Sequence, residues 1–529
     1  MTTTTPTTAR EAHLRKNLVL AAMIFAVSMT FIDQTIVAIA APEIQKELSL
    51  SSTGLQWVIN GYLVSLAALF ALGGRLSDVL GHRRMLVLGV IVFAGASTLN
   101  GLTPDGDAAE AWIITFRIVQ GAGAALMYPA ALAIVVHAFP LRERGRAMAV
   151  FFGIAGGLTA IGPMAGGFLS EWTWRAIFWV NVPVALIALV LTAMAKPADE
   201  YERQPIDWTG AALVAGGMGL SVLGLQQASV WGWGSAATIG AIAGGLAVLV
   251  GFVLYELRAA SPLIRIRIFE NRAFAAENAV LFLSMAVFIP VFFFASMYAQ
   301  ISLGWSASNA GLYLLIFFAG FAPAAQVGGR ILDKQGAKPA VVLGCAVAAA
   351  GFAFWGARVT ELSENAQWIA IIIAGAGMGL MVGPANTDAV NRAPRTSYGE
   401  ATGITQTVRN YGSSLGLAVL GTVLLNQNRM HIEDSLERFG LSKERADEVA
   451  RSLQGSGGDD RSEFTAKAGR KAEQIFEAVQ RDFAQSTRVV FYAMAVVMAV
   501  AALVALVALP WGRQEAVVEP DTVGATSTE

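Results

Sequence analysis

The sequence predicts an all-α integral membrane protein, and three observations lead to this fold class. Of its 529 residues, 55% are hydrophobic and only 14% are charged, whereas soluble globular proteins carry roughly 25% charged residues. Apolar stretches of about 20 residues recur along the chain, and each is long enough to cross a hydrocarbon core of ~30 Å. The 54 glycines suit close contact between helices in lipid.

Fourteen membrane-spanning helices are predicted from these stretches. They cover residues 17–41, 54–73, 84–102, 110–136, 146–170, 174–195, 208–228, 236–257, 275–299, 307–329, 338–358, 366–387, 399–425 and 487–510. An even number of crossings places both termini on the same side of the membrane. Residues 1–16 and 511–529 are then tails on that side, and the polar stretch 426–486 is a loop on the other side.

The distribution of Lys and Arg predicts the orientation of the chain. The tails and every second loop carry most of these residues, while the short loops on the opposite side hold only Lys46, Arg175 and Arg358. Cytoplasmic loops are enriched in Lys and Arg. We therefore expect a multi-pass protein of the cell membrane with both termini in the cytoplasm.

The loop 426–486 is the one sizeable region predicted outside the membrane. Its apolar residues recur with helical period and alternate with charged faces, which predicts two short amphipathic helices. A solvated connector is the simpler interpretation of this loop. A lid or a docking element for a partner is the alternative.

An internal repeat divides the predicted spans into two halves. The segment GRLSDVLGHRR at 74–84 returns at a constant shift along the chain as GRILDKQGAKP at 329–339. The positions of interest are Gly74, Asp78, Gly81, Arg83 and Arg84 in the first copy and Gly329, Asp333, Gly336 and Lys338 in the second. Transporters often contain such repeats. We predict a six-helix half at 17–195, an inserted helix pair at 196–258 and a second six-helix half at 259–510.

Each copy of the repeat combines glycines with an acid and bases. Glycines allow a tight turn, and the charged residues can pair across the turn or with a neighbouring helix end. A charge cluster of this kind can hold one conformation and break in another. We therefore predict that the two loops act as conformational switches, with a basic turn that only sets topology as the alternative.

Two charged residues inside predicted spans are candidates for transport chemistry. Asp33 lies deep in the first span, where insertion of an Asp near a helix centre costs about 2.5 to 3.5 kcal/mol. Because charge is disfavoured in hydrocarbon, a carboxyl there can take up a proton in one conformation and release it in another. A polar packing role is the alternative for Asp33. Arg117 has no acid nearby on its own helix, so we expect a partner elsewhere, or a structural tie to Gln120 or to a backbone carbonyl.

Several motifs, in their order and spacing, resemble the major facilitator superfamily and, within it, the fourteen-helix drug:proton antiporters. The matching segments are FIDQTIVAIAAP, GRLSDVLGHRR, FRIVQGAGAA, IGPMAGG, WRAIFWVNVP, IDWTGA and GEATGITQTVRNYGSSLGLAV. Val79 departs from the pattern, because a basic residue is common at that position. The resemblance implies a major facilitator fold and proton coupling through Asp33 and Arg117. It also implies an antiporter signature in the fifth helix, at Gly162, Pro163, Gly166 and Gly167.

The function implied by the resemblance is secondary active export. The cargo would be hydrophobic or amphipathic small molecules, cationic ones included, moved by alternating access in exchange for protons. An exporter of lipids or hydrophobic secondary metabolites is one alternative, and a non-transporting membrane sensor or scaffold is another. Residues that would line the cavity if they face inward are Gln34, Gln56, Trp57, Asn60, Tyr62, Phe288, Phe292, Tyr298, Gln300, Gln406 and Arg409. The sequence leaves the role of Glu277 and Asp388 open.

The sequence also limits which cofactors and partners can be expected. It contains no phosphate-binding loop of the form GxxxxGK(S/T), no HExxH and no other catalytic constellation, so we predict that the protein is not an enzyme and runs on the proton gradient without a cofactor. Its four histidines are dispersed and Cys345 is the only cysteine, so no metal site is predicted. The net charge of −1 gives no indication of nucleic-acid binding. We expect protons, a hydrophobic small molecule and the lipid bilayer as partners of a monomeric chain.

Overall fold

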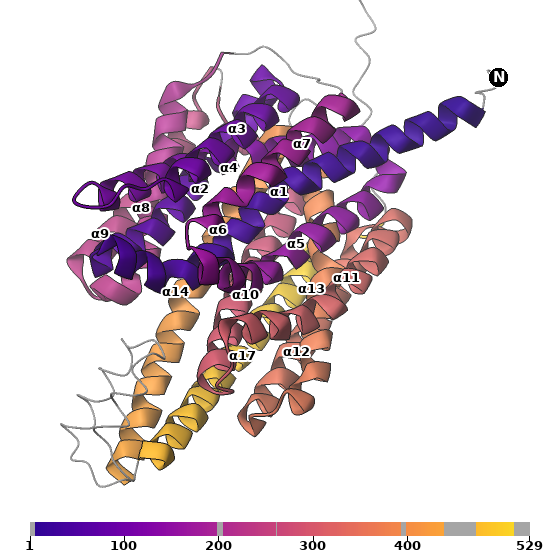
Figure 1. The fold of residues 1–529 in the computed structure, drawn as a ribbon. Coiled ribbons are helices and arrows are strands. Elements are labelled where there is room, and N and C mark those ends of the chain that lie inside the picture. The colour runs from indigo at the N-terminus through magenta and orange to yellow at the C-terminus, as the bar shows by residue number, and fades with distance from the viewer. Residues whose placement is uncertain (1–5, 198–204, 261, 393–397, 439–471, 513–529) are drawn as a thin grey trace, which may run out of the picture.

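The structure, a computed structural model, describes residues 6–197, 205–260, 262–392, 398–438 and 472–512. The helices of this part of the chain pack side by side as one bundle (Figure 1). They are α1 (Pro6–Leu48), α2 (Ser52–Leu80), α3 (His82–Gly101), α4 (Ala109–Ala138), α5 (Leu141–Trp172), α6 (Ala176–Trp179), α7 (Asn181–Ala195), α8 (Trp208–Trp231), α9 (Ala236–Glu256), α10 (Arg272–Ile301), α11 (Ala307–Gln335), α12 (Ala337–Arg358), α13 (Glu364–Asn391), α14 (Tyr398–Arg438) and α17 (Ala472–Ala508). Two short 3₁₀ turns, η1 (Ile266–Glu270) and η2 (Val359–Glu361), precede α10 and α13.

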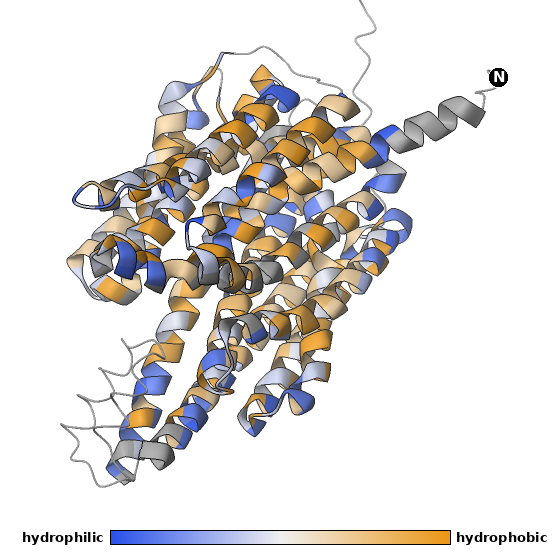
Figure 2. Cartoon of the chain, in the orientation of Figure 1, coloured by the Kyte–Doolittle hydropathy of each residue, from blue (hydrophilic) through white to orange (hydrophobic). Residues whose placement is uncertain are grey.

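The described helices confirm the all-α membrane fold. Within the part of the chain that the structure describes, twelve helical segments are long and apolar enough to cross a membrane. Large apolar side chains such as Leu186 and Val507 point outward from the bundle, where lipid is the compatible surrounding. Hydrophobic residues fill the middle of most helices, and hydrophilic residues gather toward the ends (Figure 2). Helices α5 and α14 are not among the twelve segments, so the number fourteen remains a prediction.

The two predicted halves repeat the same packing. Helix α4 packs on α2 and α3, and α13 packs on α11 and α12 in the same way. The close approaches fall at matching glycines: a Cβ added to Gly73 would collide with the carbonyl of Ala125, and one added to Gly328 would collide with the carbonyl of Leu380. Small residues let helix backbones approach this closely in lipid. The repeat in the loop sequences therefore extends through the helices.

The two repeated loops adopt the same kind of turn. Gly81 joins α2 to α3 with φ of 105°, and Gly336 joins α11 to α12 with φ of 90°. These positive φ values are strained for residues with a Cβ and are readily adopted by glycine. The backbone geometry thus explains why glycine occupies this position in both copies.

The inserted pair of the prediction corresponds to α8 and α9. These helices pack on each other, and α8 also packs on α2 and α14. Trp233, in their connection, donates a hydrogen bond from Nε1 to Thr422 Oγ1 of α14. The pair therefore contacts helices of both predicted halves.

Helices α14 and α17 extend into the stretch predicted as a loop. Residues 426–438 continue α14, and residues 472–486 belong to α17. The 41 residues of α14 extend ~60 Å at 1.5 Å per residue, about twice the thickness of the hydrocarbon core. His431 Nδ1 of α14 lies 3.0 Å from Ser486 Oγ of α17, which joins the two extensions. The remaining part of the predicted loop, 439–471, lies outside the described residues, and the predicted domain boundaries stay predictions.

The two halves meet through α5 with α11 and through α2 with α14. At the predicted cytoplasmic end of α5, Arg144 Nη1 donates to Asn391 Oδ1 at 2.8 Å. A Cβ added to the neighbouring Gly145 would collide with Asp333 and with the carbonyl of Gly329. These contacts hold the halves together at their predicted cytoplasmic ends.

Candidate functional site

A buried ion pair joins α1 to α4 inside the N-terminal half. Asp33 Oδ2 lies 2.7 Å from Arg117 Nη1, and Gln120 Nε2 donates to Asp33 Oδ1 at 2.8 Å. Asp33 is 0% exposed and Arg117 is 1% exposed. The two intramembrane charges that were predicted separately thus form one site, and Arg117 finds its partner on another helix.

Arg117 makes further contacts around this ion pair. Nε donates to the Val58 carbonyl at 2.8 Å, Nη1 donates to Gln120 Oε1 at 2.8 Å, and the guanidinium carbon lies 4.5 Å from the centre of the Tyr62 ring. Asn100 Nδ2 donates to the same Gln120 oxygen at 3.0 Å. A buried ion pair needs such additional hydrogen bonds to offset its desolvation. Asp33, Gln120 and the Val58 carbonyl therefore fix the position of the Arg117 side chain. The sequence analysis did not identify Val58 or Asn100 as part of this site.

Helix α5 touches the turn of α1 that carries Asp33. A Cβ added to Gly162 would collide with Thr35, and Gly166 is buried one turn further along α5. The glycines of the predicted antiporter signature thus allow α5 to approach α1 closely. The surroundings of the two remaining signature residues lie outside the described part: Pro163 and Gly167.

A second buried cation, Arg409 of α14, lies where the halves meet. Its Nη1 donates to Gln406 Oε1 at 2.9 Å, and its Nη2 lies 3.5 Å from Met285 Sδ of α10. Its guanidinium carbon lies 5.3 Å from the centre of the Phe152 ring of α5, and the Tyr128 hydroxyl of α4 faces it. Within the described ranges, no carboxylate forms an ion pair with Arg409. Sequence reasoning selected Gln406 and Arg409 but missed the three residues from other helices.

Two acids that the sequence left open are buried near each other. Glu277 of α10 is 0% exposed and faces Asp388 of α13. Asp388 Oδ2 lies 2.7 Å from Arg392 Nη2. Neither carboxylate oxygen of Glu277 has a hydrogen-bond partner among the described residues.

The other polar residues proposed for a cavity are less enclosed. Gln34, Trp57, Asn60 and Gln300 are half-buried, and Gln300 Nε2 donates to Ser296 on its own helix at a distance of 3.1 Å to Oγ. The side chain of Gln56 lies outside the described part of the chain. Gln34 faces Tyr62, whose ring lies against Arg117, so this residue borders the cluster around Arg117.

The aromatic cavity candidates of the second half are packed into its interior. Phe292 stacks on Phe318 with ring centres 5.3 Å apart, and its edge contacts Phe288. The Tyr298 hydroxyl donates to the Val359 carbonyl at 2.7 Å. These contacts fix the side chains by packing and hydrogen bonding.

The charged residues of the repeated loops occupy different surroundings. Asp78 is buried, with Oδ1 3.8 Å from His82 Nε2. In the second copy, Lys338 Nζ lies 4.7 Å from the centre of the Trp511 ring. Arg84 is exposed, whereas Arg83 is half-buried. The predicted switching role of both loops stays a prediction.

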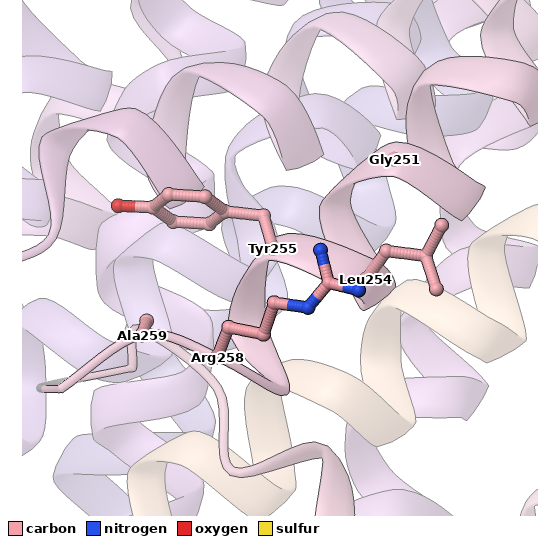
Figure 3. A pocket seen from close by; sticks show the side chains of 5 residues that line it. All are labelled: Gly251, Leu254, Tyr255, Arg258 and Ala259. Carbon is pink, nitrogen blue, oxygen red and sulfur yellow. The ribbon is translucent and has the colours of Figure 1, made fainter.

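A shallow pocket of about 360 Å³ lies at the predicted cytoplasmic end of α9. Figure 3 shows its lining, in which the Arg258 side chain extends toward Leu254 and the Tyr255 ring points the other way. Two small residues complete the lining: Gly251 and Ala259. The Tyr255 hydroxyl donates to Asp207 Oδ1 at 3.1 Å. No residue of this pocket belongs to the buried clusters around Arg117 and Arg409.

The repeated helical halves, the contacts between them and the buried charges define a membrane transporter. The family model of the Major Facilitator Superfamily matches residues 23–417, and the chain belongs to this superfamily. Among solved structures, it is similar to the proton:xylose symporter XylE, with a TM-score of 0.59, 13% identity and coverage of 95% of this chain and 97% of that one. A bacterial homologue of the human lysosomal transporter Spinster gives a TM-score of 0.55 at 18% identity, with coverage of 93% and 97%. These similarities confirm the major facilitator fold.

Curated relatives include several export and resistance proteins. The chain is 34% identical over 500 residues to the tetracenomycin C resistance and export protein of Streptomyces glaucescens, covering 92% of this chain and 90% of that protein. It is 35% identical over 410 residues to the cephamycin export protein CmcT of Amycolatopsis lactamdurans, with coverage of 74% and 81%. It is 30% identical to the multidrug resistance protein Stp of Mycobacterium tuberculosis, with coverage of 78% and 76%. The chain is therefore a multi-pass membrane transporter of small molecules and not an enzyme.

Proposed function

We propose that this transporter is a proton-coupled exporter of hydrophobic or amphipathic small molecules that works by alternating access. The observation that carries the proposal is the fully buried pair of Asp33 and Arg117, in which one carboxylate neutralises one guanidinium at 2.7 Å. Relatives named for the export of antibiotics and for resistance to them support the direction and the cargo class.

Binding and release of a proton at Asp33 would change the conformation of the transporter. A proton on Asp33 removes its negative charge and leaves Arg117 without a counter-ion in a buried site. An unpaired buried charge is costly, so protonation favours a conformation in which Arg117 reaches water or another acceptor. Because the pair joins α1 to α4, that change alters how these two helices pack.

Alternating access requires the halves to separate at one end at a time. Opening the predicted cytoplasmic end would break the hydrogen bond between Arg144 and Asn391 and the contact of Gly145 with α11. We propose that these contacts belong to the state in which the cargo site is closed to the cytoplasm. The proton gradient supplies the energy, without a cofactor, to a monomer in the cell membrane with both termini in the cytoplasm.

The names of two relatives refer to the export of tetracenomycin C and of cephamycin, and they favour antibiotics of this kind as the cargo. The joined extensions of α14 and α17 would then lie on the side where cargo is released. Deletion of residues 430–483 tests whether this region hands over cargo, because it removes the distal part of both extensions. Unchanged release by the deletion variant would contradict that role and leave the region as a connector.

Efflux from vesicles tests the proposal as a whole. Purified protein is reconstituted in liposomes, and a set of chemically distinct fluorescent compounds is screened for movement with and without a pH gradient. We expect at least one hydrophobic compound to move only while the gradient is present, and to stop when an ionophore collapses it. Efflux that is indifferent to the ionophore would overturn proton coupling.

A further inference from the structure

We infer that one face of α14, formed by Thr402, Thr405, Gln406 and Arg409 and here called the polar face, binds a negatively charged, acceptor-rich group of the exported molecule. A carboxylate or a phenolate on an aromatic body fits this description. The inference rests on the proposed export function and adds the chemistry of the cargo that the site recognises.

Helical periodicity places the polar face toward the junction of the two halves. At about 100° per residue, its four side chains fall within an arc of about 100°. Around the helix axis, Gly403 lies on one side of the polar face and packs on Gly74 of α2. Gly412 lies on the other side of the polar face and packs on Phe282 of α10. The polar face therefore points between α2 and α10, one helix from each predicted half.

The polar face is buried and its hydrogen-bonding capacity is unused. Its side chains are 1%, 0%, 3% and 5% exposed in chain order. The hydroxyls of Thr402 and Thr405, Nε2 of Gln406 and Nε of Arg409 have no hydrogen-bond partner within the part of the chain that the structure describes. The amide nitrogen of the adjacent Asn410 is in the same condition. Buried polar groups are nearly always paired in folded proteins, so a run of unpaired groups on one helix face indicates a binding surface.

The charge of the polar face differs from that of the buried site around Arg117 in the first half. There, Asp33 neutralises Arg117 at 2.7 Å. Arg409 instead contacts an amide oxygen, the Met285 sulfur, the Phe152 ring and the Tyr128 hydroxyl, none of which is negatively charged. A thioether is a weak acceptor and a ring face carries no net charge, so the positive charge of Arg409 remains uncompensated by these contacts.

The available groups select the chemistry of the ligand. The amide nitrogen of Gln406 and two hydroxyls share one helix face with the guanidinium of Arg409, whose Nε is also unpaired among the described residues. Such a set of donors binds an anion or a group of carbonyl acceptors most strongly. Phe152 and Tyr128 lie beside Arg409 from α5 and α4, which favours a flat aromatic body next to the charged group. A cationic head group would be repelled from this subsite.

A pair of isosteric probes tests the inference without a gradient. Full-length protein in lipid nanodiscs is titrated with anthracene-2-carboxylate and with anthracene-2-carboxamide, and binding is followed by fluorescence polarisation. We expect the carboxylate to bind about tenfold or more tightly than the amide, because a charge-assisted contact is stronger than a neutral one. Arg409→Gln should abolish that preference and leave amide binding within about twofold. Arg481→Gln, at a side chain that is 61% exposed on α17, is the matched control and should retain the preference.

Equal affinity for the two probes in the native protein, or an intact preference in Arg409→Gln, would overturn the inference. The fold of each variant is checked by gel filtration and thermal unfolding. If Arg409→Gln does not fold, Thr405→Val and Gln406→Leu replace it, and each should reduce the preference for the carboxylate. If the protein binds the carboxylate selectively but shows no gradient-driven efflux, the proposed function is wrong and the anion subsite stands. If it shows gradient-driven efflux but no preference for the carboxylate, the anion subsite is wrong and the proposed function stands.

Discussion

Asp33 of α1 and Arg117 of α4 face each other at 2.7 Å with both side chains withdrawn from solvent. In this ion pair both side chains are at most 2% exposed. Asp33 is a proton acceptor and Arg117 is its counter-charge. Because both are buried, removing either charge changes the free energy of unfolding.

The first prediction concerns the proton. Asp33→Asn keeps a side chain of the same shape that can still accept hydrogen bonds, but it cannot take up a proton. We expect gradient-driven efflux from liposomes to fall about tenfold or more, while binding of the cargo persists. Asp107→Asn, at an exposed position, is the matched control. Normal gradient-driven efflux in the Asp33 variant would remove this residue from the coupling mechanism.

The second prediction concerns stability. Arg117→Gln leaves the Asp33 carboxylate buried without its counter-charge, which should destabilise the fold by about 3–5 kcal/mol. The double variant Asp33→Asn with Arg117→Gln removes both charges and should be more stable than Arg117→Gln alone. Thermal unfolding of the native protein, both single variants and the double variant completes a double-mutant cycle. Strict additivity of the two substitutions would contradict an energetic coupling between these residues.

The third prediction concerns the close contact of α2 with α4. Gly73→Ala places a Cβ against the carbonyl of Ala125, and we expect it to destabilise the protein by about 1–3 kcal/mol. Gly95→Ala on α3 is the matched control, because a Cβ there meets nothing within 4 Å. Alanine is the better helix former, so the control should be neutral or slightly more stable. Equal unfolding temperatures for the two variants would show that α2 and α4 can separate without cost.

The fourth prediction concerns the contact of the halves at their predicted cytoplasmic ends. Cysteines at positions 144 and 391, in a background where Cys345 is replaced by Ala, should react with a short cleavable thiol cross-linker, because the side chains of Arg144 and Asn391 meet at 2.8 Å. The cross-link should block transport by preventing the ends from separating, and its cleavage should restore transport. Each single-cysteine variant is the control. Undiminished transport by the cross-linked protein would contradict opening at this end.

The predicted spans show how far hydropathy alone reaches. Twelve of the fourteen predicted spans match the twelve segments that length and apolar composition select among the described residues. The other two, 146–170 and 399–425, form parts of α5 and α14, and both helices lie against helices of the other half. Hydropathy locates an apolar helix, but only packing in the structure shows whether that helix faces another helix or lipid.

The cavity residues were the least predictable part of the site. Phe292 and Tyr298 are aromatic residues in spans, and the structure uses them for ring stacking and for a hydrogen bond to a backbone carbonyl. Gln406 and Arg409 were selected on the same grounds and lie between the halves. Composition cannot separate these cases, because inward-facing and packed residues have the same chemistry and differ only in what surrounds them.

The sequence by itself determined the membrane class, the repeat and the turns at Gly81 and Gly336. These depend on the length of apolar stretches and on the φ range of a single residue, which are local properties of the chain. Only the tertiary structure decided that Arg117 has an acid for a partner and that Arg409 has none among the described residues. The reason is physical: the energy of a buried charge depends on groups brought to it from other helices, and helix packing, not sequence distance, sets which groups those are.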